Sequence, residues 1–353
     1  MRNKNQADMT MRARFLLALS IAFAVPAVAQ NSQQQFASLG DFKLESGEVI
    51  RDCRIGYRTF GQLNPEKSNV IIVPTWANGT TAQMDGQFGP NRLIDTTKYY
   101  AIAMDALGNG ISSSPSNSPS QPHMKFPKFT IRDMVESQHQ VLTQMLHIQH
   151  VKAVIGASMG GMQTFQWMVT YPDFMDRAIP IVGSPRLAPY DLLFWQTEVD
   201  AITSDPGWNH GDYTEQPATT LESELTGLMA TTPERFNQIN TRDKVSEVIA
   251  TGKKSEAAVD ANNHIRQAEA MMALDVSAPF GGSLERAAAK VKAKVLIIAS
   301  ATDHTVTPGP ALDFALLLRA EILELRNECG HHAPECDSAK VNSKVSSFLE
   351  EDK

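Results

Sequence analysis

Cysteine and clustered positive charge are both scarce in this sequence. Three cysteines occur among 353 residues, and 32 Lys and Arg stand against 39 Asp and Glu, for a formal net charge of −7. Nucleic acids and anionic membrane surfaces bind proteins through runs or patches of Lys and Arg, and the sequence contains no such run. We therefore expect no nucleic acid and no charged membrane surface as a partner.

A long hydrophobic run is also missing. The most apolar segment, Phe15–Val25, is too short to span a bilayer comfortably. Four basic residues precede it, and Ala27-Val28-Ala29 follows it with the pattern of a cleavage site. These features predict a secretory signal peptide over residues 1–29, an exported protein that is periplasmic or secreted, and no stable membrane anchor. An uncleaved anchor is the alternative.

The few cysteines bear on the redox state. Export makes a disulfide possible. Cys329 and Cys336 bracket a short loop, and their pairing would leave Cys53 over. Spacing alone leaves open whether that pair closes.

The order of apolar and polar segments predicts the fold class. No internal repeat or long low-complexity tract is present, and 42% hydrophobic with 20% charged residues is ordinary for a globular protein. From Asn69 onward, apolar strand-like runs alternate with helix-like stretches, which indicates an α/β fold with a mostly parallel central sheet covered on both faces. The predicted strands are Asp41–Leu44, Arg54–Phe60, Val70–Val73, Tyr99–Met104, Val151–Ile155, Ala178–Val182, Val295–Ala299 and Ile322–Leu325; the predicted helices between them include Ile131–Leu146, Gly160–Thr170, Gly309–Arg319 and Ser338–Leu349.

One region interrupts the alternation. Residues 186–289 contain no strong strand pattern, and they separate a first core part, 30–185, from a last core part, 290–353. Because insertions on α/β scaffolds usually shape the ligand site, we expect this helical insertion to act as a lid. An additional packing layer is the alternative. The helix-like segments of the insertion are Leu187–Ile202, Thr220–Ala230 and Ala257–Leu274.

The middle of the chain carries a candidate nucleophile. Gly156-Ala157-Ser158-Met159-Gly160 fits the pattern Gly-x-Ser-x-Gly where an apolar strand meets a helix. In that context the pattern predicts a nucleophile elbow, a tight turn that holds Ser158 in a strained conformation and exposes its Oγ. The glycines omit Cβ atoms that would clash with neighbouring backbone. A purely structural turn is the alternative.

A nucleophilic serine also needs backbone donors for the developing oxyanion. The N–H of Met159, at the helix N-terminus, is one candidate. The second is expected in the loop after the first long strand, where Trp76 or Ala77 can offer its N–H and the position of Gly79 favours Ala77. Trp76 is also a candidate wall of the acyl pocket, with ordinary core packing as the alternative.

The candidate acid is Asp303, in the loop after the predicted strand Val295–Ala299. Open α/β sheets place their sites at the carboxyl ends of strands, and the chain order expected of this fold is serine, acid, histidine. Asp303 is therefore positioned to orient a histidine. An Asx turn or a helix N-cap ahead of Pro308 is the alternative.

Two adjacent histidines, His331 and His332, follow a glycine after the last predicted strand. We expect His331 to be the general base that accepts the Ser158 proton and passes it to the leaving group, with His332 as the alternative. Zinc held by these histidines together with Cys329 and Cys336 is disfavoured, because the spacing is not that of a structural zinc site. The other histidines are interpreted as polar surface or cap residues: His123, His139, His147, His150, His210, His264 and His304.

Several stretches of the mature chain carry a family resemblance. They are YRTFGQLNPEKSNVIIVPT, GPNRLIDTTKYYAIAMDALGNG, FTIRDMVESQHQVL, VIGASMGGMQTFQWMVTYPDFMDRAI, DPGWNHGDY and DANNHIRQAEAMMALD, followed by the Asp303 loop and GHH. In these stretches the chain resembles the homoserine O-acetyltransferase family, which has the α/β-hydrolase fold. The resemblance implies a triad of Ser158, Asp303 and His331, an oxyanion hole from Met159 and Ala77, and a homodimer with insertion helices meeting across a two-fold axis.

The chain departs from that family at two substrate-binding positions. The acetyltransferases hold the homoserine carboxylate with an arginine at a position that corresponds to about Val199, and the amino group with an aspartate where this chain has His332. Each missing contact costs roughly 1–3 kcal/mol, which disfavours an amino acid as acceptor. Export is a second objection, because acetyl-CoA is not expected outside the cytoplasm.

The sequence therefore predicts a serine hydrolase that cleaves a small or medium carboxylic ester through an acyl-enzyme on Ser158, with no metal or organic cofactor. Acyl transfer to an acceptor alcohol is the first alternative, and a binding protein without turnover is the second. Trp76 and Trp195 are candidate substrate-binding residues. Phe194 and Met271 are further candidates for lining an apolar lid.

Overall fold

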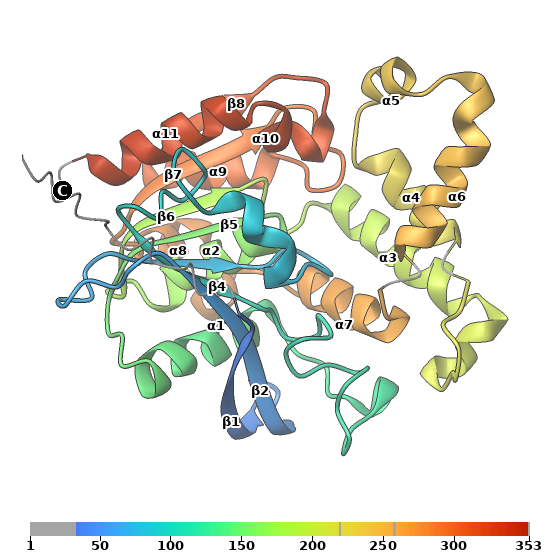
Figure 1. Ribbon diagram of the computed structural model, residues 1–353, viewed down its shortest axis with the longest axis horizontal. Helices are drawn as coiled ribbons and strands as arrows, with labels where there is room; N and C mark the ends of the chain where they lie inside the picture. Colours follow the sequence, from blue (N-terminus) through green and yellow to red (C-terminus); the bar gives the residue numbers. More distant parts are fainter. Residues whose placement is uncertain (1–32, 219, 257–258, 352–353) are drawn as a thin grey trace, which may run out of the picture.

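The computed structural model describes residues 33–218, 220–256 and 259–351. The predicted signal peptide, residues 1–29, lies outside the described residues. Within them the predicted α/β architecture is confirmed: one eight-stranded sheet has helices on both faces, and a lobe of further helices stands beside it (Figure 1). None of the described helices is long and apolar enough to cross a membrane.

The sheet brings several loops to a single edge. Its spatial order is β1-β2-β4-β3-β5-β6-β7-β8. The pairs β1–β2 and β2–β4 are antiparallel and all other neighbours are parallel. Parallel strands end at the same edge, so the loops after β3, β5, β7 and β8 meet there. The strands are β1 (Gln35–Lys43), β2 (Val49–Phe60), β3 (Val70–Pro74), β4 (Tyr100–Met104), β5 (Val151–Ala157), β6 (Met175–Ile181), β7 (Lys294–Ser300) and β8 (Glu321–Leu325).

The apolar strands are buried because helices cover both faces of the sheet. Four helices pack on one face, and α11 (Ser338–Glu350) packs on the other. The predicted helix Ile131–Leu146 proves to be an α-helix followed by a single π-helical turn, Val141–Met145. The four helices on the first face are α1 (Ile131–Gln140), α2 (Met159–Thr170), α8 (Leu284–Ala288) and α9 (Gly309–Leu318).

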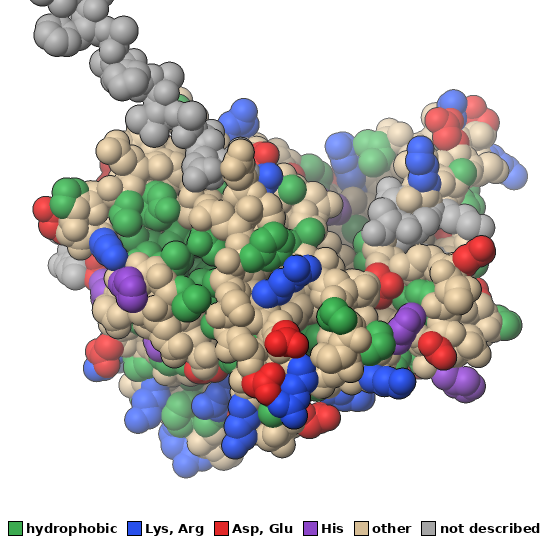
Figure 2. All heavy atoms as spheres, turned by 60° about the horizontal axis from the view of Figure 1, so that its bottom comes forward, with side chains coloured by type: hydrophobic (Ala, Val, Ile, Leu, Met, Phe, Trp, Pro, Cys, Tyr) green, Lys and Arg blue, Asp and Glu red, His purple; other side chains and the backbone are tan. Residues whose placement is uncertain are grey.

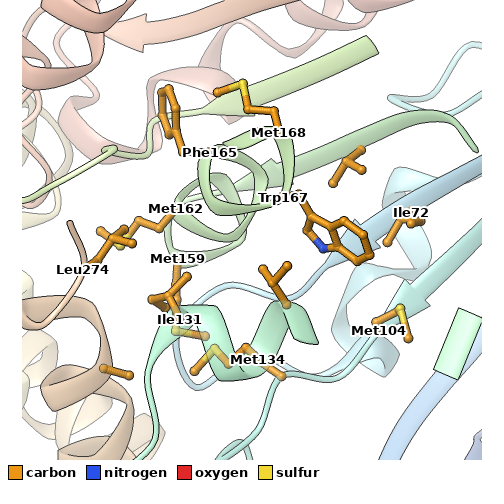
Figure 3. Close-up of a cluster of buried hydrophobic side chains, with 14 of the residues drawn as sticks. Ile72, Met104, Ile131, Met134, Met159, Met162, Phe165, Trp167, Met168 and Leu274 are labelled. Atoms are coloured by element: carbon orange, nitrogen blue, oxygen red, sulfur yellow. The ribbon is translucent and has the colours of Figure 1, made fainter. Parts of the chain in front are cut away.

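Helix α2 is the most deeply buried of the covering helices. Met159, Met162, Phe165, Trp167 and Met168 are all fully buried, and Figure 3 shows them pointing outward from α2 into the surrounding core. Burying side chains of this size stabilises the fold by about 1.5–3 kcal/mol each. Packing of these side chains therefore fixes the helix that begins directly after the half-buried candidate nucleophile.

The insertion between β6 and β7 is helical, as predicted, but contains more helices than predicted. The additional α-helices among the described residues are α5 (Pro233–Ile239), α6 (Val245–Glu256) and the short α8 at its end. Helix α7 (Ala261–Met272) begins later than predicted because the Asp260 side chain accepts the N–H of Asn263 and caps it; residues 257 and 258 lie outside the described part. The helices at the predicted places are α3 (Pro189–Thr203), α4 (Thr220–Met229) and α7.

The helices of the insertion are arranged in two parts. In Figure 1, α3, α4, α5 and α6 form the lobe, and α7 lies between that lobe and the sheet. Nearly every residue of α7 is buried. On the face shown in Figure 2, basic, acidic and hydrophobic side chains are interspersed, and the lobe stands beside the main body of the molecule.

Candidate active site

Ser158 occupies the sharp turn that the glycine pattern predicts. Strand β5 ends at Ala157, α2 begins at Met159, and Ser158 between them has φ 56° and ψ −123°. Positive φ is costly for a residue with a side chain, and such strain persists only where the surrounding structure enforces it. A Cβ on Gly156 would lie 2.2 Å from the Gly160 carbonyl oxygen, so the close approach of strand and helix requires glycine here.

Three side chains from three different strand ends converge at this turn. His331 Nε2 lies 2.9 Å from Ser158 Oγ, and His331 Nδ1 lies 2.7 Å from Asp303 Oδ2. Asp303 follows β7 and His331 follows β8. The structure thus places the predicted nucleophile, base and acid in one hydrogen-bonded series, although 173 residues separate Ser158 from His331.

Asp303 serves both roles that its position in the sequence suggests. Its Oδ1 accepts the N–H groups of Thr305 and Val306, at 2.9 and 3.0 Å, which makes the Asx turn. Its Oδ2 faces His331. The turn fixes the carboxylate, and the imidazole binds the oxygen that remains.

Electrostatics favour a charged imidazole at His331. Burial lowers its pKa, but the Asp303 carboxylate, with smaller contributions from Glu335 and Asp191, outweighs burial and raises the pKa above its usual value. The Asp303 side chain is 1% exposed, against 14% for His331. A positive charge that forms on His331 during a reaction is therefore stabilised by a fixed, buried carboxylate.

The two predicted oxyanion segments are held together by buried side-chain amides. Gln163 on α2 donates from Nε2 to the carbonyls of Thr75 (3.0 Å) and Met159 (3.3 Å). Gln163 Oε1 accepts from Gln138, and Gln138 Oε1 accepts from the Trp167 indole. This series ties the loop after β3 to the helix that starts at Met159, which is the arrangement that an oxyanion hole from both segments needs.

The insertion also contacts the site loops directly. The His331 N–H donates to the Ala230 carbonyl at 2.9 Å, and Thr232 Oγ1 donates to the Glu328 carbonyl at 2.8 Å. On the other side, Thr305 Oγ1 donates to the Met229 carbonyl at 3.0 Å. The end of α4 therefore holds both the loop of the acid and the loop of the histidine.

The fold agrees with the comparisons with known proteins. A family model described as alpha/beta hydrolase fold matches residues 69–335. The chain belongs to the α/β-hydrolase fold family. Within this family it is similar both to esterases and to homoserine O-acetyltransferases, as the sequence resemblance implies.

Several of these matches illustrate the similarity. A probable esterase of Corynebacterium glutamicum is 35% identical over 308 residues, and an ethyl acetate hydrolase of Pseudomonas veronii is 33% identical over 309; each match covers 84% of this chain and 88% of the relative. A homoserine O-acetyltransferase of Methanosalsum zhilinae is 30% identical over 352 residues, covering 88% of this chain and 71% of its own. The solved structure of an acetylester hydrolase from Corynebacterium glutamicum matches with a TM-score of 0.85 at 30% identity, covering 90% of this chain and 96% of that one.

The loop that carries His331 in this α/β-hydrolase is closed by a disulfide. Cys329 and Cys336 are bonded, with Cα atoms 6.6 Å apart, and Cys53 is free and buried. The disulfide between these two cysteines, which their spacing alone left open, therefore forms. Neither sulfur is then free to bind zinc together with the two histidines. His332 points elsewhere: its side chain is 55% exposed, and its Nδ1 lies 4.0 Å from Glu335.

The two predicted substrate-binding tryptophans lie in different places. Trp76 is half-buried, packs against the core on the α11 face and covers Gly79 in the loop after β3. Trp195 is 6% exposed on α3, and its ring packs against Phe194 and lies 6.3 Å from the His264 ring. Trp76 therefore lies within the predicted oxyanion loop, whereas the contacts of Trp195 are with the insertion.

One interpretation of the sequence is wrong. His264 is not a surface residue: it is 5% exposed on α7, with Glu198 and Glu222 of the insertion beside it. The charged partners come from two other helices, 66 and 42 residues earlier in the chain by their numbers. A lone histidine in a helical pattern gives no sign of such partners.

Proposed function

We propose that this protein is a carboxylic-ester hydrolase that works through an acyl-enzyme on Ser158, with His331 as general base and acid and Asp303 as its orienting partner. The observation that carries the proposal is the hydrogen-bonded series Ser158–His331–Asp303 built on a serine with positive φ. That series is what a serine nucleophile requires, because the neutral hydroxyl must lose its proton as it attacks.

Acylation follows from the positions of these groups. Ser158 Oγ attacks the ester carbonyl carbon while His331 Nε2 takes the hydroxyl proton, and the carbonyl oxygen becomes an oxyanion. We assign its stabilisation to the N–H groups of Met159 and Ala77. The intermediate then collapses, the C–O bond to the alcohol breaks, and His331 returns the proton to the departing alcohol.

Deacylation repeats these steps with water. His331 takes a proton from water as the water oxygen attacks the acyl carbonyl. The second tetrahedral intermediate expels Ser158 Oγ, which recovers its proton from His331, and the carboxylic acid leaves. Every step moves protons among groups that the chain itself supplies, so the proposal requires no metal or organic cofactor.

Short acyl esters, acetyl esters above all, are the proposed substrates. Esterase relatives with a named substrate class include an ethyl acetate hydrolase and an acetylester hydrolase. Trp76, in the loop that carries Ala77, is the proposed wall of the acyl pocket. In that role the bulky ring would favour a small acyl group.

Acyl transfer to an alcohol is the second candidate, because homoserine O-acetyltransferases are also relatives. The acyl-enzyme would be the same, and only the second nucleophile would differ. By the sequence resemblance, a position at about Val199 and the exposed His332 correspond to those where the acetyltransferases hold the charged groups of homoserine, so an amino acid acceptor is disfavoured.

The test is an ester screen with purified mature protein. We expect hydrolysis that falls as the acyl chain lengthens, and labelling by a fluorophosphonate probe that Ser158→Ala abolishes. If folded wild-type protein takes up no label, the binding-protein alternative is favoured. Reaction in the presence of added alcohols separates hydrolysis from transfer: product that goes wholly to the alcohol at modest concentration would favour the transferase.

Export and assembly complete the proposal. We propose that cleavage after Ala29 releases the protein to the periplasm or beyond, and mass analysis of the protein from fractionated cells tests this.

We also propose a homodimer, because the insertion exposes large apolar side chains that a second copy can cover. Sedimentation over a dilution series tests it. These side chains include Leu193 (67% exposed), Leu228 (66%) and Leu221 (56%).

A further inference from the structure

The loop after β3 is held at both ends by the core and in its middle by helix α7. At one end the Thr75 N–H donates to the Met104 carbonyl at 3.1 Å. At the other, Asn109 Nδ2 donates to the Gly79 carbonyl at 2.9 Å. Between them lies Asn78, with φ +60°. Asn78 directly follows Ala77, whose N–H is the proposed second oxyanion donor.

Two side chains of α7 hold Asn78. The Asn78 N–H donates to Gln267 Oε1 at 2.7 Å, and Asn78 Nδ2 lies 2.8 Å from His264 Nδ1. His264 and Gln267 are three residues apart, so they lie on the same face of the helix. One side chain thus binds the backbone of Asn78 and the other binds its amide group.

Both side chains are themselves fixed. Gln267 is fully buried and donates from Nε2 to the Leu107 carbonyl at 2.9 Å, so its amide has one orientation. His264 Nε2 lies 3.3 Å from Glu198 Oε2. Glu198, 1% exposed on α3, accepts at Oε1 from Thr226 of α4 at 2.6 Å. Glu222 Oε1 lies 3.7 Å from His264 Nδ1, so the ring lies between two carboxylates, and Nδ1 is the ring nitrogen within hydrogen-bond distance of Asn78 Nδ2.

We infer that His264 and Gln267 are positioning residues for the oxyanion hole: they hold Asn78 in its left-handed conformation and thereby set the direction of the Ala77 N–H, with Glu198 orienting His264. The inference rests on the proposed function. Neither α7 residue touches the triad, so their effect passes through the loop.

The position of an oxyanion donor matters more for the transition state than for the bound ester. A donor acts on the charge that develops as Ser158 attacks, and a displacement of about 1 Å can cost about 100-fold in rate. Loss of the α7 contacts should therefore lower kcat and leave KM nearly unchanged.

The experiment compares His264→Leu, His264→Asn and Gln267→Met in the full mature protein. We expect kcat on a short ester to fall about 10- to 100-fold in His264→Leu and Gln267→Met, with KM within about threefold. Affinity for a boronic acid, which forms a tetrahedral adduct on Ser158, should fall by a similar factor. His264→Asn keeps an acceptor for Asn78 Nδ2 and should recover part of the loss. His139→Leu is the matched control, because it removes a half-buried histidine of α1 and should leave kcat unchanged.

Asn78→Gly provides a variant that does not disturb the buried helix. Glycine tolerates positive φ, so only the side-chain contact to His264 is lost. If His264 acts through Asn78, adding His264→Leu to Asn78→Gly lowers kcat little further, and the two effects fall short of additivity. Additive effects, or folded variants with wild-type kcat and boronate affinity, would overturn the inference.

Hydrogen exchange separates this inference from the proposed function. If the wild type neither hydrolyses esters nor binds the boronic acid, the proposed function is wrong. The amide of Asn78 still reports on the α7 contacts: faster exchange over residues 75–80 in Gln267→Met supports them, and unchanged exchange overturns them.

Discussion

Strand β3 and helix α2 of the sheet core differ from helices α3, α4 and α7 of the insertion in the charged side chains that they bury. Every residue of β3 is buried and apolar or small, and α2 is buried along nearly its whole length. The insertion instead buries Glu198, Glu222 and His264 and exposes leucines such as Leu193. Burying charge is costly unless it is paired, so these positions of the insertion depend on pairing in a way that β3 and α2 do not.

This difference separates two tasks. The core supplies the proposed reacting groups, because Ser158, Asp303 and His331 all lie at ends of its strands. The insertion supplies contacts that hold their loops, through the end of α4 and through the α7 pair. Buried polar groups are directional, whereas apolar packing is not, so they suit a region whose task is to position.

The largest effect is expected from the core, in Asp303→Asn. The change removes the charge that orients and stabilises the His331 imidazolium, so kcat should fall by about 10⁴-fold. Steady-state kinetics of the folded variant measure it. Asp200→Asn, at an exposed position of α3, is the control in the insertion and should leave kcat unchanged. Similar losses in both variants would erase the division between the two regions.

The same substitution should change the pH dependence. His331 must be neutral to act as a base, and its pKa is raised in the wild type, so activity should rise with pH through that raised pKa. In Asp303→Asn burial remains and the carboxylate charge is lost, so the acid limb of kcat/KM should move to lower pH. If the acid limb does not move, the titration that it reports belongs to a group other than His331.

The next largest effect is on stability, in matched leucine truncations. Leu296→Ala in β7, at a fully buried position, should lower the free energy of unfolding by about 2–5 kcal/mol. Leu228→Ala in α4, at a position 66% exposed, should change it by less than about 0.5 kcal/mol. Urea unfolding measures the free energy of unfolding of both variants at a protein concentration too low for dimers to form. A large cost at Leu228 that vanishes on dilution would show that a second copy buries it.

The disulfide should have a smaller effect, on the loop that joins the two regions. Removing Cys329–Cys336 with paired serine substitutions should cost about 2–3 kcal/mol of stability by chain entropy for so short a loop. Because His331 lies inside this loop, kcat should fall as well. Cys53→Ser is the control thiol substitution. Equal kcat with and without the disulfide would mean that the Ala230 contact alone holds the histidine.

The smallest effect is expected from exposed charges of the insertion. Lys244 Nζ and Glu247 Oε2 lie 2.9 Å apart, but the two side chains are 59% and 69% exposed. Glu247→Gln should change stability by less than about 0.5 kcal/mol and leave kcat unaltered, because such pairs are solvated and screened. Glu198→Gln, at a buried position, should cost more in kcat. Equal responses would mean that burial of charge in the insertion has no consequence.

Prediction from the sequence succeeded where the signal was local. The Gly-x-Ser-x-Gly pattern placed Ser158 at a strand-to-helix turn, and strand ends placed Asp303 and His331 at the same edge. The ends of helices were less certain: α7 begins at Ala261 because of the Asp260 cap, and the predicted helix after Thr130 changes to a π-helical turn at Val141. Such boundaries depend on side-chain hydrogen bonds that periodicity does not report.

The sequence by itself determined the α/β fold and pointed to the three proposed reacting side chains and their order in the chain, because hydrophobic period and tight-turn chemistry act over a few residues. Only the tertiary structure decided that Cys329 pairs with Cys336, that Gln163 joins two oxyanion segments and that His264 reaches Asn78. The last of these contacts joins residues 186 apart in the chain. Contacts of that kind depend on where packed elements finally lie, and no local pattern encodes that.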